Sequence, residues 1–486
     1  MAVLENIEPK SVMRFFEEIC SIPHGSYHTD KIADYLVDFA SKRGLECTRD
    51  ASNNVIIKKR ASNCDSTTPV ILQGHTDMVC EKEDDSTIDF LNDGLKLIVD
   101  GDVVRADKTT LGADDGIAVA MILAILDSDL YVHPPIEAVF TTDEEVGMLG
   151  AAALDCGNLK SKYLINLDSE DEGHILASCA GGVRAHVKKN FKITSQTGVL
   201  AELRVSGLLG GHSGQEIDKG RANADVLLAR VLYEMAESKY SIASMSGGTK
   251  DNAIPRNAMA LLMFANKDAF LKASKILSTT LNKIKTEYMH TDKNICIDLA
   301  IKSEESTEKA ISPEDSLNLS KLIYSLPNGV MAMSHAIDGL VETSLNLGIL
   351  EMKDGELQLV YALRSSVESA MDSLFDRIVC IADAFGATVS SHGRYQPMEY
   401  RVDSALRKVM MDIYQEMYGE EMVVDAIHAG VECGIFAGKI AGLDAVSIGP
   451  NLRDIHTPNE TMEIESVVRT WKYVLSVLDF MGSHVI

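Results

Sequence analysis

The chain has 486 residues, of which 46% are hydrophobic and 24% charged, a composition typical of a globular protein with a large core and two or more domains. Its 72 acidic and 46 basic residues give a net charge of −26, which argues against nucleic acid or an anionic membrane surface as a partner. The nine cysteines, an odd number without a C-x-x-C pair, indicate scattered buried thiols in a reducing compartment. The first twenty residues do not match a signal peptide, and no apolar run approaches about 18 residues, so we expect a cytoplasmic protein.

The N-terminal region predicts helices that cover a sheet. Residues 9–42 have helical periodicity around the breaker IPHG, and NNVIIKK then predicts a strand. The β-rich run PVILQGHTDMV places His75 and Asp77 at its end. Residues two apart on an extended chain point to one face, so His75 can bind a metal while Asp77 fixes its tautomer. Taken alone this H-x-D pattern is weak, and an ordinary loop histidine would explain it better.

Three acidic groups follow at the ends of strands or turns. LGADDG places Asp114 and Asp115 at the start of an apolar helix, where helix capping by these acids is an equally good explanation. The apolar strand IEAVF leads into TTDEEVGMLG, so Glu144 and Glu145 lie where open α/β sheets place their chemistry. A third strand, in KYLINLDSEDEG, ends at Asp168. A solvated acidic turn would explain DEE in isolation, but a divalent cation would offset the repulsion within the whole set.

Beyond this region the pattern changes to alternating strands and longer amphipathic helices without acid clusters, which indicates an inserted domain. Two similar passes suggest internal duplication within it. Pro397 marks the return, and His456 follows the short strand AVSIG, in the loop PNLRDIHTPNE. We therefore predict an α/β fold whose catalytic domain has a central mixed, mostly parallel sheet flanked by helices. The predicted boundaries are 1–183 and 397–486 for this domain and 184–396 for an inserted α+β domain.

The candidate ligands share nitrogen and oxygen donor atoms, and none is a thiolate: His75, Asp114, Glu145, Asp168 and His456. Such a set suits two zinc ions bridged by one carboxylate. A water between two metals loses much of its proton affinity, and a nearby carboxylate that is not a ligand can take its proton. Glu144 is left over for this task.

Four motifs in this order, GHTDMV, LGADDG, TDEEVGMLG and NLDSE, resemble those of the cocatalytic zinc peptidases, which include aminoacylases, glutamate carboxypeptidases and tripeptidases. GGHSG, DNAIPR, HAGVECG and IGPNLRDIHTPNE are similar to the branch of aminoacyl-histidine (Xaa-His) dipeptidases, and this resemblance covers essentially the whole chain. It implies a zinc-peptidase catalytic domain with an inserted lid. It also implies two Zn²⁺ per chain, with Co²⁺ or Mn²⁺ as substitutes.

For the metal site, the resemblance implies these ligands: His75, Asp114 and Asp168 on one zinc, and Asp114, Glu145 and His456 on the other. Asp114 would be the bridge, Glu144 the general base, and Asp77 the residue that orients the first histidine. The branch often has Asn after the bridging Asp, where this chain has Asp115. This leaves the choice of bridge between two neighbours, of which the position directly after LGA favours Asp114. A cis peptide bond between them is also implied.

In the lid, the resemblance implies that His212 stabilises the tetrahedral oxyanion and that Asn252 and Arg364 bind the substrate carboxylate, for which an Arg fork is well suited. Without the resemblance, GGHSG would be a helix N-cap region, Asn252 a turn and Arg364 a surface cation. Glu432 would meet the free amino group of the substrate or pair with a neighbouring base. Related lid-bearing dipeptidases place the lid histidine in the active site of the partner subunit. We therefore expect a homodimer through the lid, with His212 acting in cis or in trans.

The expected function is hydrolysis of unblocked dipeptides, including Xaa-His substrates of the β-Ala-His type, by metal-bound hydroxide with Glu144 as general base. A tripeptidase or an N-acyl amino acid deacylase would share every metal ligand. A noncatalytic binding protein should have lost Glu144 or a ligand, and this chain has lost none. A dinuclear phosphoesterase would need a basic phosphate clamp, which the sequence does not show.

Overall fold

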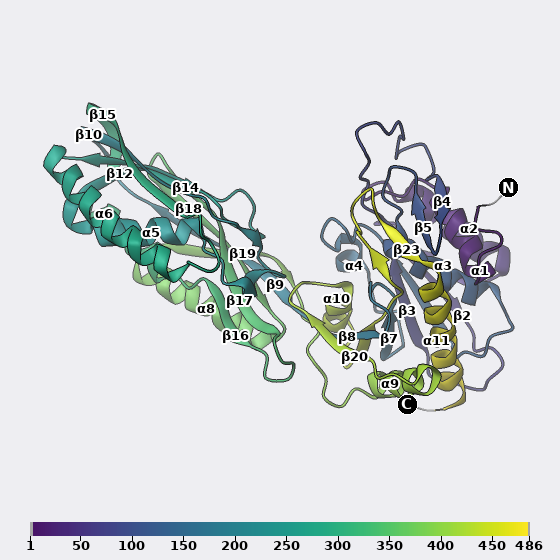
Figure 1. Ribbon diagram of the computed structural model, residues 1–486. Helices are drawn as coiled ribbons and strands as arrows, with labels where there is room; N and C mark the ends of the chain where they lie inside the picture. Colours follow the sequence, from purple (N-terminus) through teal and green to yellow (C-terminus); the bar gives the residue numbers. More distant parts are fainter. Residues whose placement is uncertain (1–2, 485–486) are drawn as a thin grey trace. The chain divides into compact units, whose positions relative to one another are not determined.

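The computed structural model describes residues 3–484 and divides into two compact units (Figure 1). Unit 1 contains Met1–Cys179, Met398–Ala426 and Val431–Ile486, and unit 2 contains Ala180–Pro397 and Ile427–Gly430. The first boundary precedes the expected position after residue 183, because Gly181 already pairs with Ser365 in the sheet of unit 2.

The segment Ile427–Gly430, which the sequence assigned to the catalytic domain, belongs to unit 2. The main-chain N–H of Ala180 donates to the carbonyls of Ile427 and Ala429, and Ser344 Oγ lies 2.7 Å from His428 Nε2. These contacts attach the segment to the sheet of unit 2.

Unit 1 is built on an eight-stranded sheet in the order β1-β2-β6-β3-β7-β21-β8-β20. The four central strands β6, β3, β7 and β21 run parallel to one another, and the pairs β1–β2, β2–β6 and β8–β21 are antiparallel. The predicted mixed sheet with a parallel centre is thus confirmed. The bounds of the eight strands are β1 (Glu46–Arg49), β2 (Val55–Lys59), β3 (Val70–His75), β6 (Ile136–Thr141), β7 (Tyr163–Asn166), β8 (His174–Cys179), β20 (Val423–Ile427) and β21 (Asp444–Ser447).

A second, four-stranded sheet and a set of helices complete unit 1. The sheet has the order β22-β23-β5-β4, with β4 (Leu97–Asp100), β5 (Val103–Ala106), β22 (Leu452–Arg453) and β23 (Thr461–Glu463). The hairpin expected around the Asp-Gly turn is β4–β5. The helices are α1 (Lys10–Cys20), α2 (Asp30–Arg43), α3 (Ala113–Asp127), α4 (Leu149–Ala153), α9 (Ala405–Tyr418), α10 (Glu432–Lys439) and α11 (Ile464–Ser483).

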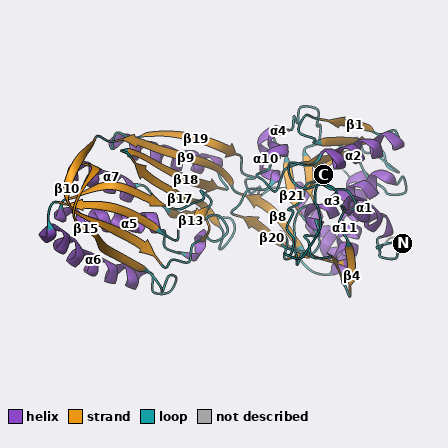
Figure 2. Ribbon diagram, turned by 90° about the horizontal axis from the view of Figure 1, so that it is seen from above, coloured by secondary structure: helices purple, strands orange, loops and turns teal. Residues whose placement is uncertain are grey.

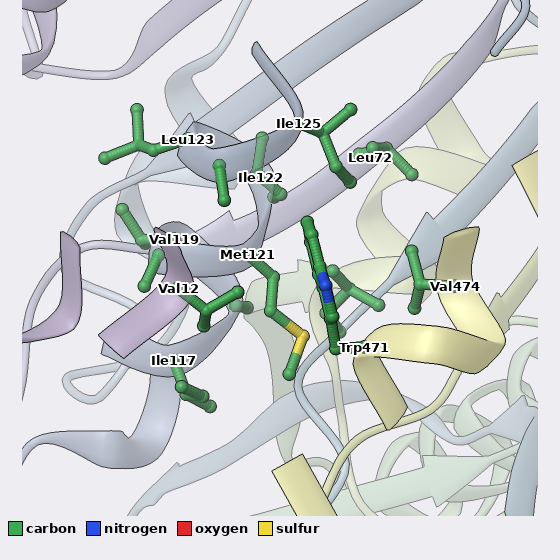
Figure 3. Close-up of a cluster of buried hydrophobic side chains, with 14 of the residues drawn as sticks. Val12, Leu72, Ile117, Val119, Met121, Ile122, Leu123, Ile125, Trp471 and Val474 are labelled. Carbon is green, nitrogen blue, oxygen red and sulfur yellow. The ribbon is translucent and has the colours of Figure 1, made fainter. Parts of the chain in front are cut away.

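Helix α3 is the centre of the hydrophobic core of unit 1. Every residue from Gly116 to Leu126 is buried, and α3 packs against α1 and β3. A helix that is apolar all round must be enclosed on every side. Figure 3 shows its side chains, Met121 among them, in one cluster with Trp471 and Val474 of α11. Trp471 is the one tryptophan of the chain and is 6% exposed, so its fluorescence reports on this core.

Unit 2 is built on a nine-stranded antiparallel sheet whose order is β15-β10-β14-β12-β17-β18-β9-β19, with β16 paired to β17. Helices α5 (Ala224–Glu234), α6 (Lys267–Glu287), α7 (Pro313–Ser325) and α8 (Glu368–Ala384) pack on one face of it (Figures 1 and 2). The strand bounds are β9 (Gly181–Asn190), β10 (Ile193–Ser206), β12 (Tyr240–Gly247), β14 (Ala258–Phe264), β15 (Cys296–Ile311), β16 (Gly329–Met333), β17 (Val341–Lys353), β18 (Glu356–Ser365) and β19 (Thr388–Tyr395).

GGHSG in unit 2 does not cap a helix. It contains the short strand β11 (Gly211–His212), which pairs with β13 (Ala253–Ile254) and continues into a turn. The strands and helices of this unit agree with the predicted α+β insert.

All nine cysteines are free, but the expectation that they are buried holds for only some of them, since Cys80, Cys296 and Cys380 are exposed. In residues 3–484, no helix combines the length and the apolar character that a membrane span requires.

The C-terminus of α3 is closed by a buried lysine. Lys59 is 8% exposed, and its Nζ donates to the carbonyl oxygens of Ile125 and Leu126, each at 3.2 Å, and of Ser128 at 2.7 Å. These carbonyls lack partners within the helix, and a cation also matches the negative end of the helix dipole.

Replacing this lysine should therefore destabilise unit 1. We expect Lys59→Met, which keeps the aliphatic stem, to lower the free energy of unfolding by about 1–3 kcal/mol, because buried carbonyls lose their donors. Urea unfolding followed by Trp471 fluorescence measures this. The matched control is Lys42→Met, whose partner Asp38 is a surface neighbour and whose side chain is 70% exposed. If Lys42→Met lowers the free energy of unfolding as much as Lys59→Met does, the bonds from Lys59 to the end of α3 do not explain the effect.

Candidate metal centre

The predicted ligands come together at one edge of the unit 1 sheet. His75 is the last residue of β3, Glu145 follows β6, and Asp168 follows β7. These three strands are adjacent and parallel, so their carboxyl ends meet. Asp114 at the start of α3 and His456 in the loop after β22 complete the set.

The first ligand group consists of His75, Asp114 and Asp168. The Nε2 atom of His75 lies 3.0 Å from Asp114 Oδ1 and 3.6 Å from Asp168 Oδ1. Its Nδ1 lies 3.0 Å from the main-chain oxygen of Asp77, an acceptor, so Nδ1 carries the hydrogen. The lone pair of Nε2 in the neutral ring therefore faces the carboxylates.

The second group consists of Asp114, Glu145 and His456. His456 Nε2 lies 3.1 Å from Asp114 Oδ2 and 2.9 Å from Glu145 Oε2. Asp114 thus turns one oxygen towards each histidine. Both loops contain residues in the left-handed region, with φ of 61° at His456 and 52° at Asp143 before the glutamates, as is common where structure fixes a functional residue.

The residues fit two divalent cations. In each group the three donor atoms lie within 4.8 Å of one another, and each group has one imidazole and two carboxylates, a donor set that zinc accepts. Glu145 Oε1 is buried without a hydrogen-bond partner among the described residues, so the carboxylate has capacity left for a cation. Burial raises the pKa of Asp168 to about 7, and the neighbouring Asp114 and Glu145 carboxylates add to this effect, while His75 opposes it.

Asp115, the other residue that the sequence left open as the bridge, is placed differently from Asp114. Its Oδ2 accepts a hydrogen bond from the main-chain N–H of His75 at 3.1 Å, and it belongs to neither ligand group. Gly74 makes room for it, because a Cβ there would lie 2.6 Å from Asp115 Oδ2. The Asp114–Asp115 peptide bond is cis.

Asp77 contacts both His75 and the loop that carries the two glutamates. The closest contact of His75 Nδ1 is to the main-chain oxygen of Asp77, and the carboxylate Oδ1 lies 3.5 Å away. The carboxylate also accepts from the main-chain N–H of Glu144 at 3.0 Å and of Glu145 at 3.3 Å, and from Ser26 Oγ at 2.8 Å. Asp77 therefore fixes both the imidazole and the loop that carries the two glutamates.

Glu144 lies beside the ligand groups but belongs to neither. Burial raises the pKa of its carboxyl well above the ordinary value, and the nearby Asp168 and Glu432 add to this effect. A carboxylate with increased proton affinity is suited to accept a proton near neutral pH.

In unit 2, His212 presents a defined tautomer. Its Nδ1 accepts from the main-chain N–H groups of Gly214 and Gln215 at 3.3 and 3.2 Å, so in the neutral ring the hydrogen is on Nε2. Burial and the neighbouring Arg364 lower the pKa of His212, which favours this neutral form. Asn252 lies near it, and both line a cavity of about 970 Å³ within unit 2.

Arg364 is buried rather than a surface cation, with 7% of the residue exposed. It donates from Nη1 to Tyr395 Oη at 3.1 Å, and its Nε has no partner among the described residues. A Cβ at Gly214 would lie 3.1 Å from that Nε, 3.0 Å from His212 Cε1 and 2.8 Å from the carbonyl oxygen of His428. These groups therefore converge on one small volume, which explains why the last residue of GGHSG, Gly214, is a glycine.

His428 is a buried neighbour of Arg364 that the sequence motifs did not single out. It is the first residue of HAGVECG, from which only Glu432 was chosen, so its place in that motif could have identified it.

Glu432 is fully buried at the start of α10. Its Oε2 accepts hydrogen bonds from Gln73 Nε2 and from Thr141 Oγ1, at 2.7 Å for the latter. Gln73 in turn accepts from Asn166 Nδ2 at 2.7 Å. The sequence left two partners open for Glu432, the substrate amine or a neighbouring base. The partners in the structure are instead neutral side chains. Oε1 has no partner among the described residues.

Comparison with known proteins agrees with this architecture. Residues 71–479 match peptidase family M20/M25/M40. The cytosol non-specific dipeptidase of Escherichia coli (strain K12) is 35% identical over 483 residues, which cover 98% of this chain and 99% of that protein. The crystal structure of the aminoacylhistidine dipeptidase from Vibrio alginolyticus superposes with a TM-score of 0.90 at 34% identity, covering 98% of this chain and 97% of that one.

A more distant structure, the aminopeptidase PepT from Bacillus cereus ATCC 10987, shares the fold with a TM-score of 0.59 at 17% identity, covering 97% of this chain and 98% of that one. The resemblance seen in the motifs is thereby confirmed over nearly the full length. With its ligand groups at the carboxyl edge of a mixed sheet and an inserted α+β unit, the chain belongs to peptidase family M20/M25/M40.

Proposed function

We propose that this protein is a zinc-dependent dipeptidase that hydrolyses unblocked dipeptides, including Xaa-His substrates of the β-Ala-His type. The observation that carries the proposal is the pair of three-ligand groups that share Asp114, with Glu144 beside them and in neither. The full-length relatives, a non-specific dipeptidase and an aminoacylhistidine dipeptidase, support dipeptides as the substrate class.

In this proposal, each of the two ligand groups holds one Zn²⁺, with Co²⁺ or Mn²⁺ as substitutes. The bound cations would polarise the scissile carbonyl and lower the pKa of the attacking water. The chain prepares the ligands: the Nδ1–H of His75 is held by the main-chain oxygen of Asp77, which leaves Nε2 free to bind a cation.

Glu144 is the proposed general base. It takes a proton from the attacking water and passes it to the leaving amine nitrogen, so that one carboxylate serves both halves of the reaction. The bonds from its own N–H and that of Glu145 to the Asp77 carboxylate support this role, because they fix the loop.

Three residues of unit 2 are proposed as substrate contacts. The Nε2–H of His212 would donate to the oxyanion, and the tautomer set by its two backbone bonds supports this. Arg364 would bind the substrate carboxylate together with Asn252, and the unpartnered Nε of this buried arginine supports that assignment. A contact between Glu432 and the substrate amine stays a prediction, for which its unpartnered Oε1 is the one supporting feature.

We also propose a homodimer formed through unit 2 and a cytoplasmic location. The name of the Escherichia coli relative, a cytosol non-specific dipeptidase, supports the location. The net charge of −26 is consistent with a small-molecule substrate rather than a nucleic acid.

The decisive test is a substrate panel with the purified protein. We expect release of free amino acids from Ala-His and β-Ala-His, loss of activity after treatment with a chelator, and its recovery on addition of Zn²⁺. A tripeptide and an N-acetylated amino acid serve as the comparison arms. Faster turnover of either of these than of every dipeptide would overturn the proposed substrate class.

The two adjacent glutamates should differ in phenotype. Glu144→Gln keeps size and ligands, so metal content should stay near two ions per chain, while kcat falls by about 10²–10⁴, typical of a lost general base. Glu145→Gln should instead lower the metal content, because it removes a charged ligand. Elemental analysis and steady-state kinetics on both variants measure this, and the reverse pattern would exchange the two roles.

Complementation shows whether His212 acts in cis or in trans. Glu144→Ala and His212→Ala chains are co-expressed in equal amounts, and mixed dimers are isolated with two different tags. If His212 serves the partner's site, one of the two sites in each mixed dimer carries both groups, which is about a quarter of all sites when subunits pair at random. Activity of the mixed dimers no higher than that of either variant alone would exclude action in trans.

A further inference from the structure

The start of α3 is held by a carboxylate from a distant part of the chain. Glu460 Oε2 accepts from the main-chain N–H of Leu111 at 2.7 Å and of Gly112 at 3.0 Å. Its Oε1 accepts from the N–H of Ala113 at 2.8 Å and of Asp114 at 3.4 Å. One side chain, 2% exposed, thus satisfies four consecutive donors, the last of which belongs to the residue shared by both ligand groups.

This arrangement compensates for a cap that the helix itself cannot provide. The first N–H groups of a helix have no partner within it, and a side chain at the N-cap usually accepts from them. Here the N-cap is Gly112, with φ of 65°, and a Cβ at this position would lie 2.8 Å from Met78 Sδ. A side chain at residue 112 would have to displace Met78 and adopt a left-handed backbone conformation, and Glu460 supplies the acceptor instead.

Glu460 also belongs to the loop that carries His456. The N–H of Glu460 donates to the carbonyl oxygen of Thr457 at 3.1 Å, and Thr457 Oγ1 donates to the carbonyl of Asp454 at 2.7 Å. These bonds form two consecutive turns, residues 454–457 and 457–460, and His456 lies in the first of them. Fixing the Glu460 carboxylate on the start of α3 therefore fixes the position of His456 relative to Asp114.

We propose that Glu460 is a positioning residue. It fixes the geometry of the second ligand group more than that of the first. Two ligands of the second group, Asp114 and His456, depend on its contacts, whereas the first group shares only Asp114. The inference rests on the proposed metal site, but it concerns ion binding and is independent of which substrate is hydrolysed.

The expected result is an unequal loss of affinity for the two ions. In Glu460→Gln, one oxygen becomes an NH₂ donor that faces N–H groups, so two of the four bonds are replaced by repulsion between donors. We expect the affinity for the second ion to fall by about 10- to 100-fold, as is typical when a partner that orients a ligand is removed, with a smaller change for the first ion. Glu460→Asp keeps the charge but is one methylene shorter, and it should shift affinity in the same direction.

The experiment is a stepwise titration of the metal-free full-length chain with Co²⁺, followed by the visible absorption of the bound ion and by calorimetry. A His456→Ala chain provides the spectrum of an ion held by the first group alone, which assigns the two steps. The matched control is Glu465→Gln, which removes a nearby acid whose side chain is 78% exposed and should leave both steps unchanged. The ratio of kcat to KM on Ala-His is recorded in parallel.

The proposal is supported if the second step weakens in both Glu460 variants and the first changes less. Equal weakening of both binding steps, or no change in either, would overturn the proposal. Normal ion binding in Glu460→Asp would also overturn it, because the charge of the carboxylate alone would then explain the effect. If neither variant folds by circular dichroism and Trp471 fluorescence, Glu460 is a purely structural residue and the proposal fails. If the wild-type chain binds two ions but cleaves no dipeptide, the proposed function fails, while the titration still decides the role of Glu460.

Discussion

The repulsion among carboxylates around Asp114 is the constraint on which the rest of unit 1 depends. Several acids lie within a few ångströms of one another with only two imidazoles among them. Carboxylates in such a place are stable only if cations or hydrogen-bond donors face their oxygens. The structure divides the acids accordingly. Those in the two ligand groups face one another, whereas Asp77, Asp115 and Glu460 accept hydrogen bonds from the chain.

Asp77, Asp115 and Glu460 are held mainly by backbone N–H groups. Asp77 accepts from Glu144 and Glu145, and Asp115 accepts from His75, so each fixes a neighbouring functional residue. Glu460 accepts from the start of α3. Main-chain donors cannot be displaced without moving the backbone segment that contains them. The rigidity of the sheet edge is thereby passed to the side chains of the site.

Helix α3 links this site to the core. Its apolar surface offers no polar contacts along its length, so its orientation depends on packing and on its two ends. Buried charges of the sign that the helix dipole favours close both ends, Glu460 at the start and Lys59 at the finish. Neither belongs to a segment adjacent to α3 in sequence. The helix that carries Asp114 is therefore positioned by two segments of unit 1 that are distant from it in sequence, one containing Lys59 and the other Glu460.

The sequence predicted the mixed sheet, the inserted unit and the residues that gather at the sheet edge, because short motifs after apolar strands are local signals. It did not predict contacts that depend on distant segments. The main-chain oxygen of Asp77, rather than its carboxylate, faces His75, and no residue pattern encodes which oxygen is nearer. Glu460 stands in a motif that was used only for His456, and its partners lie more than three hundred residues earlier. The attachment of Ile427–Gly430 to unit 2 is likewise a tertiary pairing.

The position of β21 in the sheet has a consequence for how the chain is made. This strand lies between β7 and β8, yet it is synthesised after the whole of unit 2. At a synthesis rate of ~5–20 residues/s, the apolar edge of β7 waits on the order of tens of seconds for its neighbour. During that interval unit 2, nearly continuous in sequence, has most of its residues available, while unit 1 lacks a central strand and its last helix. An exposed strand edge is a template for pairing with other chains. The nascent chain is therefore most exposed to such pairing in the interval before β21 is synthesised.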